Sequence, residues 1–325
     1  MSFIEVKNLC KDYKIVKTEK GLAGAFKSLF HREYEIRQAV RDVSFSMERG
    51  EITGYIGPNG AGKSTTIKML SGVLIPTSGS VTVGGIVPYE KRSENAKRIG
   101  VVFGQRSQLY WDLPISDTFD LYESLYEIPK EQFRKNCGFF TELLDMGSFL
   151  NQPVRQLSLG QKMKANIAIA LLHDPDVLYL DEPTIGLDVI SKKILRSAIK
   201  EINREKGTTI ILTTHDMDDI EATCNRLILI DGGQKLFDGT LPDFRGKYAG
   251  DYSVRMEFDG EAPEWKDIPG YVLAERTSTE LLINVSKSIP TREAMVTLVN
   301  ACDPQNIYIL ESRIEDVVER AYQNH

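Results

Sequence analysis

The sequence predicts an α/β protein in which a largely parallel sheet is flanked by helices, followed by a small α+β domain. Strand-like and helix-like segments alternate from residue 51 onward, which is typical of a parallel sheet. A glycine-rich loop joins the first of these strands to the next helix. After about residue 250 paired strands and two helices replace the alternation, so residues 1–245 and 250–325 are expected to form separate domains.

Composition favours a globular protein and disfavours several other classes. The 325 residues suffice for a main domain and a smaller one, with an ordinary hydrophobic share of 42%. A net charge of −6 disfavours a general nucleic-acid binder, because such proteins usually carry a basic excess. The four cysteines include no C-x-x-C pair, and the four histidines form no ligand cluster in sequence.

We expect neither a membrane span nor a secretory signal in this chain. No window approaches eighteen consecutive apolar residues. The N-terminal segment carries charges throughout and lacks the apolar core of a secretory signal. We therefore expect the chain to be located in the cytoplasm. If it acts at a membrane, we expect it to do so from the membrane surface.

The N-terminal region is expected to begin with two strands separated by an insertion. Residues 3–9 alternate like an edge strand, and residues 39–47 read as the partner strand. The insertion, about residues 14–38, has one apolar helical face that comprises Leu22, Phe26, Leu29 and Phe30. With its lysines and arginine, such a helix would rest on a membrane surface or a partner protein. The alternative is a helix packed on its own domain.

The rest of the main domain is expected to alternate strands with helices around a helical subdomain at about residues 107–172. Before this subdomain we expect strands at residues 51–56, 80–83 and 99–103, and a helix over residues 63–70. After it we expect the strand VLYL, a helix at residues 190–204, the strand TTIILTT, a helix at residues 217–224, the strand RLILI and the hairpin IDGGQKLF.

The C-terminal domain, residues 250–325, mixes strand-like and helix-like segments. The strand-like segments are YSVRMEF, VLAERTSTELLINV and NIYIL, and the helix-like ones are PTREAMVTLVNAC and IEDVVERAY. None of these segments carries a functional motif, so dimer support, regulation and contact with a membrane partner all stay open for this domain.

The segment from Gly57 to Ser64 matches the phosphate-loop pattern G-x-x-x-x-G-K-[ST] between a strand and a helix. Its glycines let successive N–H groups point at phosphate oxygens, and the helix N-terminus adds positive potential. Lys63 should reach the β- and γ-phosphates, and Ser64 should offer its hydroxyl to Mg²⁺. The alternative is a plain glycine turn. The candidate nucleotide-binding residues are Gly57, Pro58, Asn59, Gly60, Ala61, Gly62, Lys63, Ser64 and Thr65.

A second motif consists of an apolar strand, residues 177–180, that ends in two carboxylates. Asp181 would hold Mg²⁺, directly or through water. Glu182 points differently and would orient or deprotonate an attacking water. This Walker B arrangement, downstream of a phosphate loop, predicts a P-loop NTPase.

Residues Leu157–Gln161, with the sequence LSLGQ, resemble the L-S-G-G-Q signature of ABC ATPases. Other elements of that family follow in its order: Gln105 resembles the Q-loop glutamine, and the segment GLD ending at Asp188 resembles the D-loop. His215 resembles the switch histidine, and Tyr13 sits where an adenine-stacking aromatic is expected. The resemblance covers roughly residues 3–245. The sequence departs from the family at the third signature position, where Leu159 stands in place of the usual glycine. Gln108 is a less favoured alternative to Gln105 as the Q-loop glutamine.

The resemblance implies a P-loop NTPase of ABC ATPase type: a RecA-like core with an antiparallel β subdomain and a helical subdomain. It implies a dimer with two ATP molecules sandwiched between the phosphate loop of one subunit and the signature loop of the other. The candidate catalytic residues are Lys63, Gln105, Glu182 and His215. Further nucleotide contacts are expected from Ser158, Gly160, Gln161 and Asp188. The implied Mg²⁺ ligands are Ser64, Gln105 and Asp181.

The implied function is that of the ATP-binding and ATP-hydrolysing subunit of a transporter. The residues within these motifs look most like those of cassettes of bacterial type-2 ABC exporters. ATP and Mg²⁺ are the implied cofactors. The implied partners are a second copy of the chain, or a homologous cassette, and membrane permease subunits, with no nucleic acid. The implied place is cytoplasmic and peripheral on the inner face of the cell membrane.

Two other functions remain to be separated from this one. A soluble ABC ATPase acting on nucleic acid or ribosomes would usually carry two cassettes or a long coiled-coil insert, and this chain has one cassette and an acidic balance. A nucleotide kinase or GTPase would share the phosphate loop but lack the signature and the switch histidine. The transported substrate is not encoded here, because that selectivity belongs to the permease.

Overall fold

The computed structural model describes residues 2–16, 34–104, 107–248, 250–310 and 313–323. The chain divides into two compact units, Met1–Thr240 and Leu241–His325. The amphipathic helix expected at residues 22–30 lies outside the described residues.

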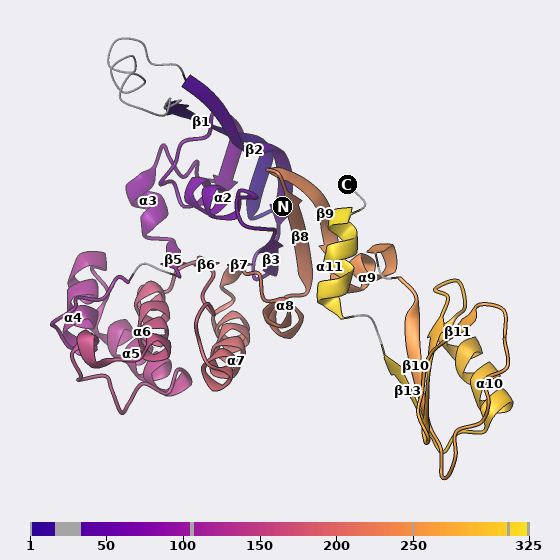
Figure 1. Ribbon diagram of the computed structural model, residues 1–325. Coiled ribbons are helices and arrows are strands. Elements are labelled where there is room, and N and C mark those ends of the chain that lie inside the picture. Colours follow the sequence, from indigo (N-terminus) through magenta and orange to yellow (C-terminus); the bar gives the residue numbers. More distant parts are fainter. Residues whose placement is uncertain (1, 17–33, 105–106, 249, 311–312, 324–325) are drawn as a thin grey trace, which may run out of the picture. The chain divides into compact units, whose positions relative to one another are not determined.

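A six-stranded sheet forms the centre of the first unit (Figure 1). Its strands, in spatial order, are β5 (Ile99–Phe103), β6 (Val177–Asp181), β7 (Thr209–Thr213), β3 (Ile52–Ile56), β8 (Arg226–Asp231) and β9 (Gln234–Thr240). The first five are parallel, and β9 pairs antiparallel with β8. Every residue of β3, β6 and β7 is buried, as expected for strands covered on both faces. The predicted α/β class is confirmed.

A second, antiparallel sheet of three strands comprises β2 (Tyr34–Met47), β1 (Ile4–Val16) and β4 (Ser78–Val83). One hydrophobic cluster joins this sheet to the central one, with members such as Leu9, Val81 and Tyr179. Strands β1 and β2 extend farther than the sequence predicted. Their pairing continues through Tyr13 opposite Arg37 to Val16 opposite Tyr34, within the stretch expected as an insertion.

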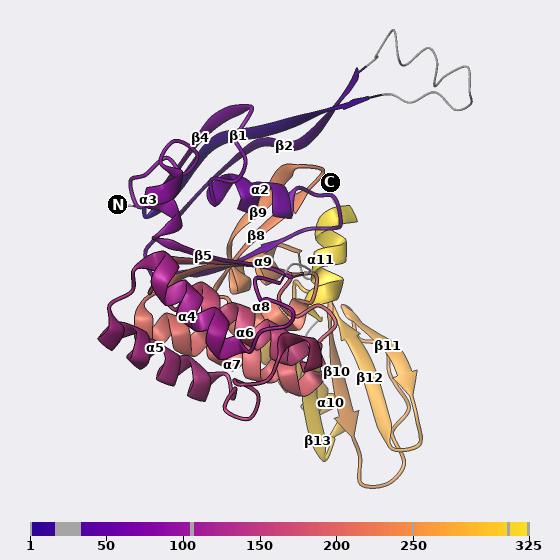
Figure 2. The ribbon, with the colours of Figure 1, turned by 90° about the vertical axis from the view of Figure 1, so that its left-hand side faces the viewer.

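Helices cover both faces of the central sheet. Figure 2 shows α2 (Lys63–Leu70) on the same side as the antiparallel sheet, and α4 to α7 on the other side. The remaining helices of this unit are α3 (Arg92–Ala96), α4 (Ile115–Tyr126), α5 (Lys130–Leu143), α6 (Leu159–Leu171), α7 (Val189–Lys206), α8 (Met217–Thr223) and a 3₁₀ turn at Val154–Gln156. Helices α4, α5 and α6 pack on one another, and this group of helices is referred to below as the helical subdomain.

The second unit is a small α+β structure. It contains α9 (Leu241–Tyr248), β10 (Tyr252–Glu257), β11 (Tyr271–Arg276), β12 (Glu280–Val285), α10 (Thr291–Cys302), β13 (Asn306–Leu310) and α11 (Ile314–Gln323). The strands form an antiparallel sheet in the order β11-β12-β10-β13. Its core includes Met256, Ile283 and Leu298, so α10 covers one face of the sheet. The segment VLAERTSTELLINV is two strands rather than one, because Thr277 turns back to hydrogen-bond Glu280.

Candidate functional site

A cavity of about 920 Å³ opens in the first unit, next to the carboxyl ends of β3 and β6 and the N-terminus of α2. It brings together most of the site residues predicted from the sequence. Those among its lining are Tyr13, Pro58, Asn59, Gly60, Gly62, Lys63, Ser64, Thr65, Asp181, Glu182 and His215. Ala61, a further residue of the predicted loop, is buried at 2% exposure. The carboxyl edge of a parallel sheet is where α/β proteins usually bind ligands.

The loop between β3 and α2 has a backbone that only glycine adopts without strain at its last position. Gly62 has a φ of 105°, and a Cβ there would lie 2.4 Å from the carbonyl oxygen of Ala39. Lys63 is only 7% exposed, and its Nζ donates a hydrogen bond of 2.6 Å to the carbonyl of Gly57. The loop therefore wraps around the lysine and presents backbone N–H groups at a helix N-terminus, a favourable site for phosphate.

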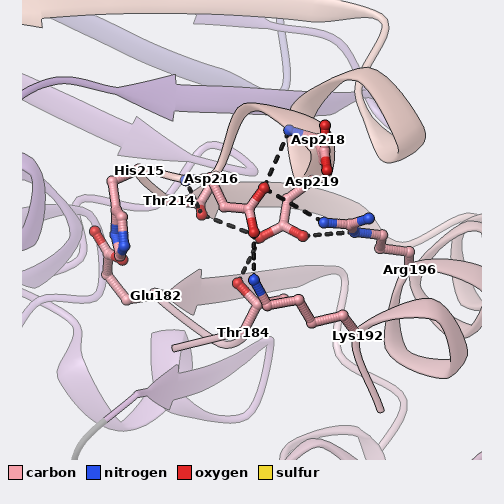
Figure 3. Close-up of polar contacts among 9 residues, drawn as sticks. All are labelled: Glu182, Thr184, Lys192, Arg196, Thr214, His215, Asp216, Asp218 and Asp219. Atoms are coloured by element: carbon pink, nitrogen blue, oxygen red, sulfur yellow. Dashed lines mark hydrogen bonds and ion pairs between the residues drawn. The ribbon is translucent and has the colours of Figure 1, made fainter. Parts of the chain in front are cut away.

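Three side chains from separate segments meet at the cavity floor. The Nζ of Lys63 lies 3.6 Å from Oε1 of Glu182, and the other oxygen of Glu182 lies 2.6 Å from Nδ1 of His215 (Figure 3 shows this second pair). A cation, a carboxylate and an imidazole thus converge beside the phosphate loop. This convergence suits charge neutralisation and proton handling at a bound phosphate group.

Glu182 has an unusual backbone conformation. Its φ of 56° lies in the left-handed region, which costs about 1–2 kcal/mol for a residue with a side chain. Its N–H donates to the backbone oxygen of Thr213 at 3.0 Å and to the hydroxyl of the same residue at 3.1 Å. Such strain persists only where the surrounding structure fixes it, and it is commonly found at functional sites.

Asp181 and Ser64 supply the oxygen donors expected for Mg²⁺. Both line the cavity, and Asp181 accepts a hydrogen bond of 2.6 Å from the hydroxyl of Thr213, which orients its carboxylate. Among the described residues no group of three histidine, cysteine or acidic side chains forms a self-contained metal site. One carboxylate and one hydroxyl suit Mg²⁺ that takes its remaining ligands from water and substrate phosphates.

Tyr13 lies at the rim of the cavity on β1, directly opposite Arg37 on β2. The Nζ of Lys11 sits 5.6 Å from the centre of the Tyr13 ring. Arg37 also lines the cavity, as does the exposed Val73, and neither was singled out from the sequence. For Arg37 the available signal was cross-strand pairing with Tyr13, because directly opposed residues share one face.

Of the two glutamines proposed for the Q-loop role, the structure describes only one. Gln105 lies outside the described residues. Gln108 donates a hydrogen bond of 2.5 Å to the carbonyl of Val101 and accepts one of 3.0 Å from the hydroxyl of Tyr122. These contacts tie the start of the helical subdomain to β5, and Gln108 is not among the cavity's lining residues.

The signature residues do not line the cavity of their own chain, as far as the described residues show. Ser158 caps α6: its hydroxyl accepts from the Gln161 N–H at 3.2 Å, and the Gln161 side chain accepts from the Ser158 N–H at 2.8 Å. Gly160 packs against Ser191, where a Cβ would lie 2.7 Å from the hydroxyl oxygen. Leu159 leaves this cap intact and is 50% exposed.

Asp188 is also outside the cavity lining given by the described residues. It caps α7 by accepting hydrogen bonds of 2.8 Å from the N–H and from the hydroxyl of Ser191. These bonds, the backbone one first, hold the pKa of Asp188 below its ordinary value. Ser158, Gly160, Gln161 and Asp188 thus lie at the starts of α6 and α7, and none of them is among the described residues that line the cavity.

The aromatic residues after the Q-loop segment divide into two groups. Tyr110 and Trp111 are exposed, and the Nζ of Lys162 lies 4.9 Å from the centre of the Trp111 ring. Phe119 is 2% exposed and packs in the core of the helical subdomain.

In the described part of the chain, no helix is both long and apolar enough to cross a membrane.

Comparison with known proteins places this geometry in context. A family model described as ABC transporter matches residues 40–185. The chain is 35% identical over 212 residues to the ABC transporter ATP-binding protein NatA of Bacillus subtilis, covering 65% of this chain and 86% of that protein. It is 34% identical over 208 residues to the Nod factor export ATP-binding protein I of Ralstonia nicotianae, covering 64% of each.

A solved structure shares the fold. It is a dimeric, post-hydrolysis state of an ATP-binding cassette bound to ADP and Pi, with 27% sequence identity and a TM-score of 0.60. The similarity covers 73% of this chain and 98% of that one. The shared region is therefore an entire cassette of the known structure.

Proposed function

This chain belongs to the ATP-binding proteins of ABC transporters, and we propose that it binds and hydrolyses ATP to drive transport through a separate membrane permease. The observation that carries the proposal is the convergence of Lys63, Glu182 and His215 beside a phosphate loop in one cavity. Membership of this ATPase family supports the hydrolysis, and coupling to transport is part of the proposal.

The proposed chemistry is attack of water on the γ-phosphate of ATP. The phosphate loop holds the phosphates, and Lys63 neutralises charge on the transferring group. Glu182 orients or deprotonates the water, and His215, hydrogen-bonded to Glu182, holds this carboxylate and the γ-phosphate in place. Ser64 and Asp181, with Gln105, would hold Mg²⁺, which neutralises phosphate charge when bound. Tyr13 stacks on the adenine.

A second subunit completes the proposed site. Ser158, Gly160, Gln161 and Asp188 are nucleotide-binding candidates that do not line the cavity of the described chain. In a head-to-tail dimer they would contact ATP held by the partner's phosphate loop. The dimeric state of the related cassette supports this arrangement. Because the sequence of one chain carries every candidate residue, so that one chain could supply both sites, we propose a homodimer.

The proposed setting is the inner face of the cell membrane, where the chain would dock on permease subunits from the cytoplasm. The exposed side chains of Tyr110 and Trp111 would contact the permease there. We propose export as the direction, because one similar protein is a Nod factor export ATP-binding protein. The ATPase unit would span residues 1–245, followed by the α+β domain of residues 250–325.

Glu182→Gln tests this function directly. We expect the variant to bind ATP as tightly as the natural chain, because the substitution keeps the shape of the side chain. Its turnover should fall about 10²–10³-fold, since a group that acts mainly in the transition state is lost. Phosphate release and equilibrium binding of ATP measure the two quantities separately.

Glu205→Gln is the matched control, because Glu205 lies exposed on α7 and pairs with its neighbour Arg204. Its turnover should match that of the natural chain. Normal turnover in Glu182→Gln would remove Glu182 from its proposed role, and failure of the natural chain to hydrolyse ATP would contradict the function itself.

A further inference from the structure

A buried carboxylate is hydrogen-bonded to residues that are near neighbours of Glu182 and His215 in the sequence. Asp219, on α8, is 1% exposed. Its Oδ2 accepts hydrogen bonds from the hydroxyl of Thr184 at 2.5 Å and from the hydroxyl of Thr214 at 3.1 Å. Its Oδ1 accepts one of 2.6 Å from Nε of Arg196 on α7 (Figure 3). Both oxygens of this carboxylate are therefore engaged.

Two of the three side-chain donors to Asp219 come from the loops that carry the proposed catalytic pair. Thr184 follows Glu182 by two residues in the loop after β6, and Thr214 directly precedes His215 in the loop after β7. Asp219 thus joins these loops at a single carboxylate, and it is not among the described residues that line the nucleotide cavity.

Further hydrogen bonds connect the loop after β7, which carries His215, to helix α7. Asp216, directly after His215, accepts a hydrogen bond of 2.5 Å from Nζ of Lys192 and one of 3.4 Å from Arg196. Its backbone N–H donates to the hydroxyl of Thr214 at 3.0 Å. The loop that carries His215 is therefore held on both sides of that residue.

The conformation of Glu182 requires such an anchor. Its left-handed φ of 56° is unfavourable for a side chain, so the loop would relax without contacts that hold it. The Thr184 hydroxyl supplies one contact on the C-terminal side of Glu182, and Thr213 supplies another on its N-terminal side. The distance of 2.6 Å between Glu182 and His215 depends on both loops staying in register.

Stability alone is a weak explanation for the Arg196–Asp219 pair. Removing two charges from water costs free energy that their attraction offsets only in part, so apolar packing of similar volume is often as stable. Three hydrogen bonds that meet on one carboxylate, by contrast, specify the positions of the two loops and of helix α7 that donate them.

We propose that Asp219 is a positioning residue for ATP hydrolysis, which sets the geometry of Glu182 and His215 through Thr184 and Thr214 while Arg196 holds its second oxygen. The inference rests on the proposed ATPase function. Asp219 acts on turnover and leaves ATP binding unchanged, because the phosphate loop and Tyr13 lie on other segments.

The test is Asp219→Asn in the full chain, since this substitution keeps the volume but replaces one accepting oxygen with an NH₂ group. One set of donors then loses its acceptor, and the loops shift. A displacement of about 1 Å at a reacting group costs up to about 10²-fold in rate, so we expect kcat to fall at least 10-fold. KM and the dissociation constant for ATP should stay within about twofold.

Asp238→Asn is the matched control. Asp238 pairs with Arg226 at 2.6 Å between β8 and β9, the same type of ion pair in the same unit, and it is not among the described residues that line the cavity. The control should lower the melting temperature without changing kcat per ATP-binding site. A purely structural role for Asp219 would give this same pattern and would overturn the proposal.

Thr184→Val provides a second arm in case Asp219→Asn does not fold, because it removes a single hydroxyl and keeps the charge pair. We expect a loss of kcat of severalfold with unchanged ATP affinity. Unchanged kcat in a folded variant, while the natural chain hydrolyses ATP, contradicts this inference alone. A natural chain that binds ATP but does not hydrolyse it contradicts the proposed function, and the inference with it.

Discussion

At the scale of single residues, the phosphate loop depends on the backbone that Gly62 permits. A Cβ at this position would lie 2.4 Å from the backbone oxygen of Ala39, and the φ of 105° is unfavourable for any side chain. We expect Gly62→Ala to lower the free energy of unfolding by roughly 2–4 kcal/mol. The dissociation constant for ATP should rise at least 10-fold, because the N–H groups of the loop shift. Denaturant unfolding and nucleotide titration measure these changes.

Gly138→Ala is the contrasting substitution. Gly138 lies inside α5, where nothing approaches its Cβ position within 4 Å. Alanine should therefore stabilise the helix by about 0.5–1 kcal/mol and leave ATP binding unchanged. Equal effects of the two substitutions would show that the loop geometry at Gly62 is not decisive.

Leu159 is the residue at which the sequence departs from its family's signature. The structure shows that its backbone still begins α6 and that Ser158 and Gln161 still cap the helix. Its side chain approaches the D-loop segment, where a Cβ on Gly186 would lie 2.9 Å from it. The leucine therefore adds an exposed apolar contact without removing the cap.

At the scale of secondary-structure elements, His173 joins the helical subdomain to the central sheet. Its ring stacks on Tyr126 of α4 at 4.1 Å, and Nε2 donates to the carbonyl of Ile99 at 3.1 Å. Burial lowers the pKa of His173 to about 4, although the hydrogen bond to Ile99 and the charge of Asp174 act in the opposite direction. Its Nδ1 is buried and has no hydrogen-bond partner among the residues that the structure describes.

This pKa makes stability depend on pH in a defined direction. Above about pH 6.5 the histidine is neutral in both states and contributes no penalty. As the pH falls from 6.5 to about 4, the unfolded chain binds a proton that the folded chain does not, so folding becomes less favourable. The loss should reach roughly 2–3 kcal/mol at the lower end.

Urea unfolding of the natural chain and of His173→Gln across this pH range measures the contribution. Glutamine keeps a donor for Ile99 but does not titrate, so the difference between the two curves isolates the histidine. A difference that is the same at pH 6.5 and at pH 4 would contradict the assignment.

The elements were largely predictable from the sequence because their patterns are local. The helix from Lys63 to Leu70 and the buried strands before and after the helical subdomain follow from apolar runs bounded by turns. The cap of Ser158 by Gln161 follows from their spacing. The extension of β1 to Val16 was missed, because its exposed outer part carries no strong hydrophobic signal.

The distances between side chains at the candidate site could be predicted from the sequence less well than the helices and strands. The sequence indicated Lys63, Glu182 and His215 as separate motifs, but their mutual distances depend on the order of strands in the sheet. Asp219 and Arg196 lie on amphipathic helices where charged residues usually face solvent. Their burial could not be read from a pattern, because it arises from packing between α7 and α8.

At the scale of the whole molecule, the residues proposed to contact the nucleotide lie in two places on the described chain. The phosphate loop, Glu182 and His215 line the cavity, whereas Ser158 and Asp188 lie outside its described lining. In the proposed dimer, a shared site brings the two sets of residues together. Binding of ATP should then drive association, because its contacts with the second subunit form only in the closed state.

The most direct measurement of this account is the molar mass of Glu182→Gln by size-exclusion chromatography with light scattering, with and without ATP and Mg²⁺. Hydrolysis should be slow in this variant, so the closed state should accumulate. We predict a monomer without nucleotide and a dimer with it, and Ser158→Arg in the same background should stay monomeric while it still binds ATP. A Glu182→Gln chain that binds ATP and remains a monomer would contradict the shared-site account.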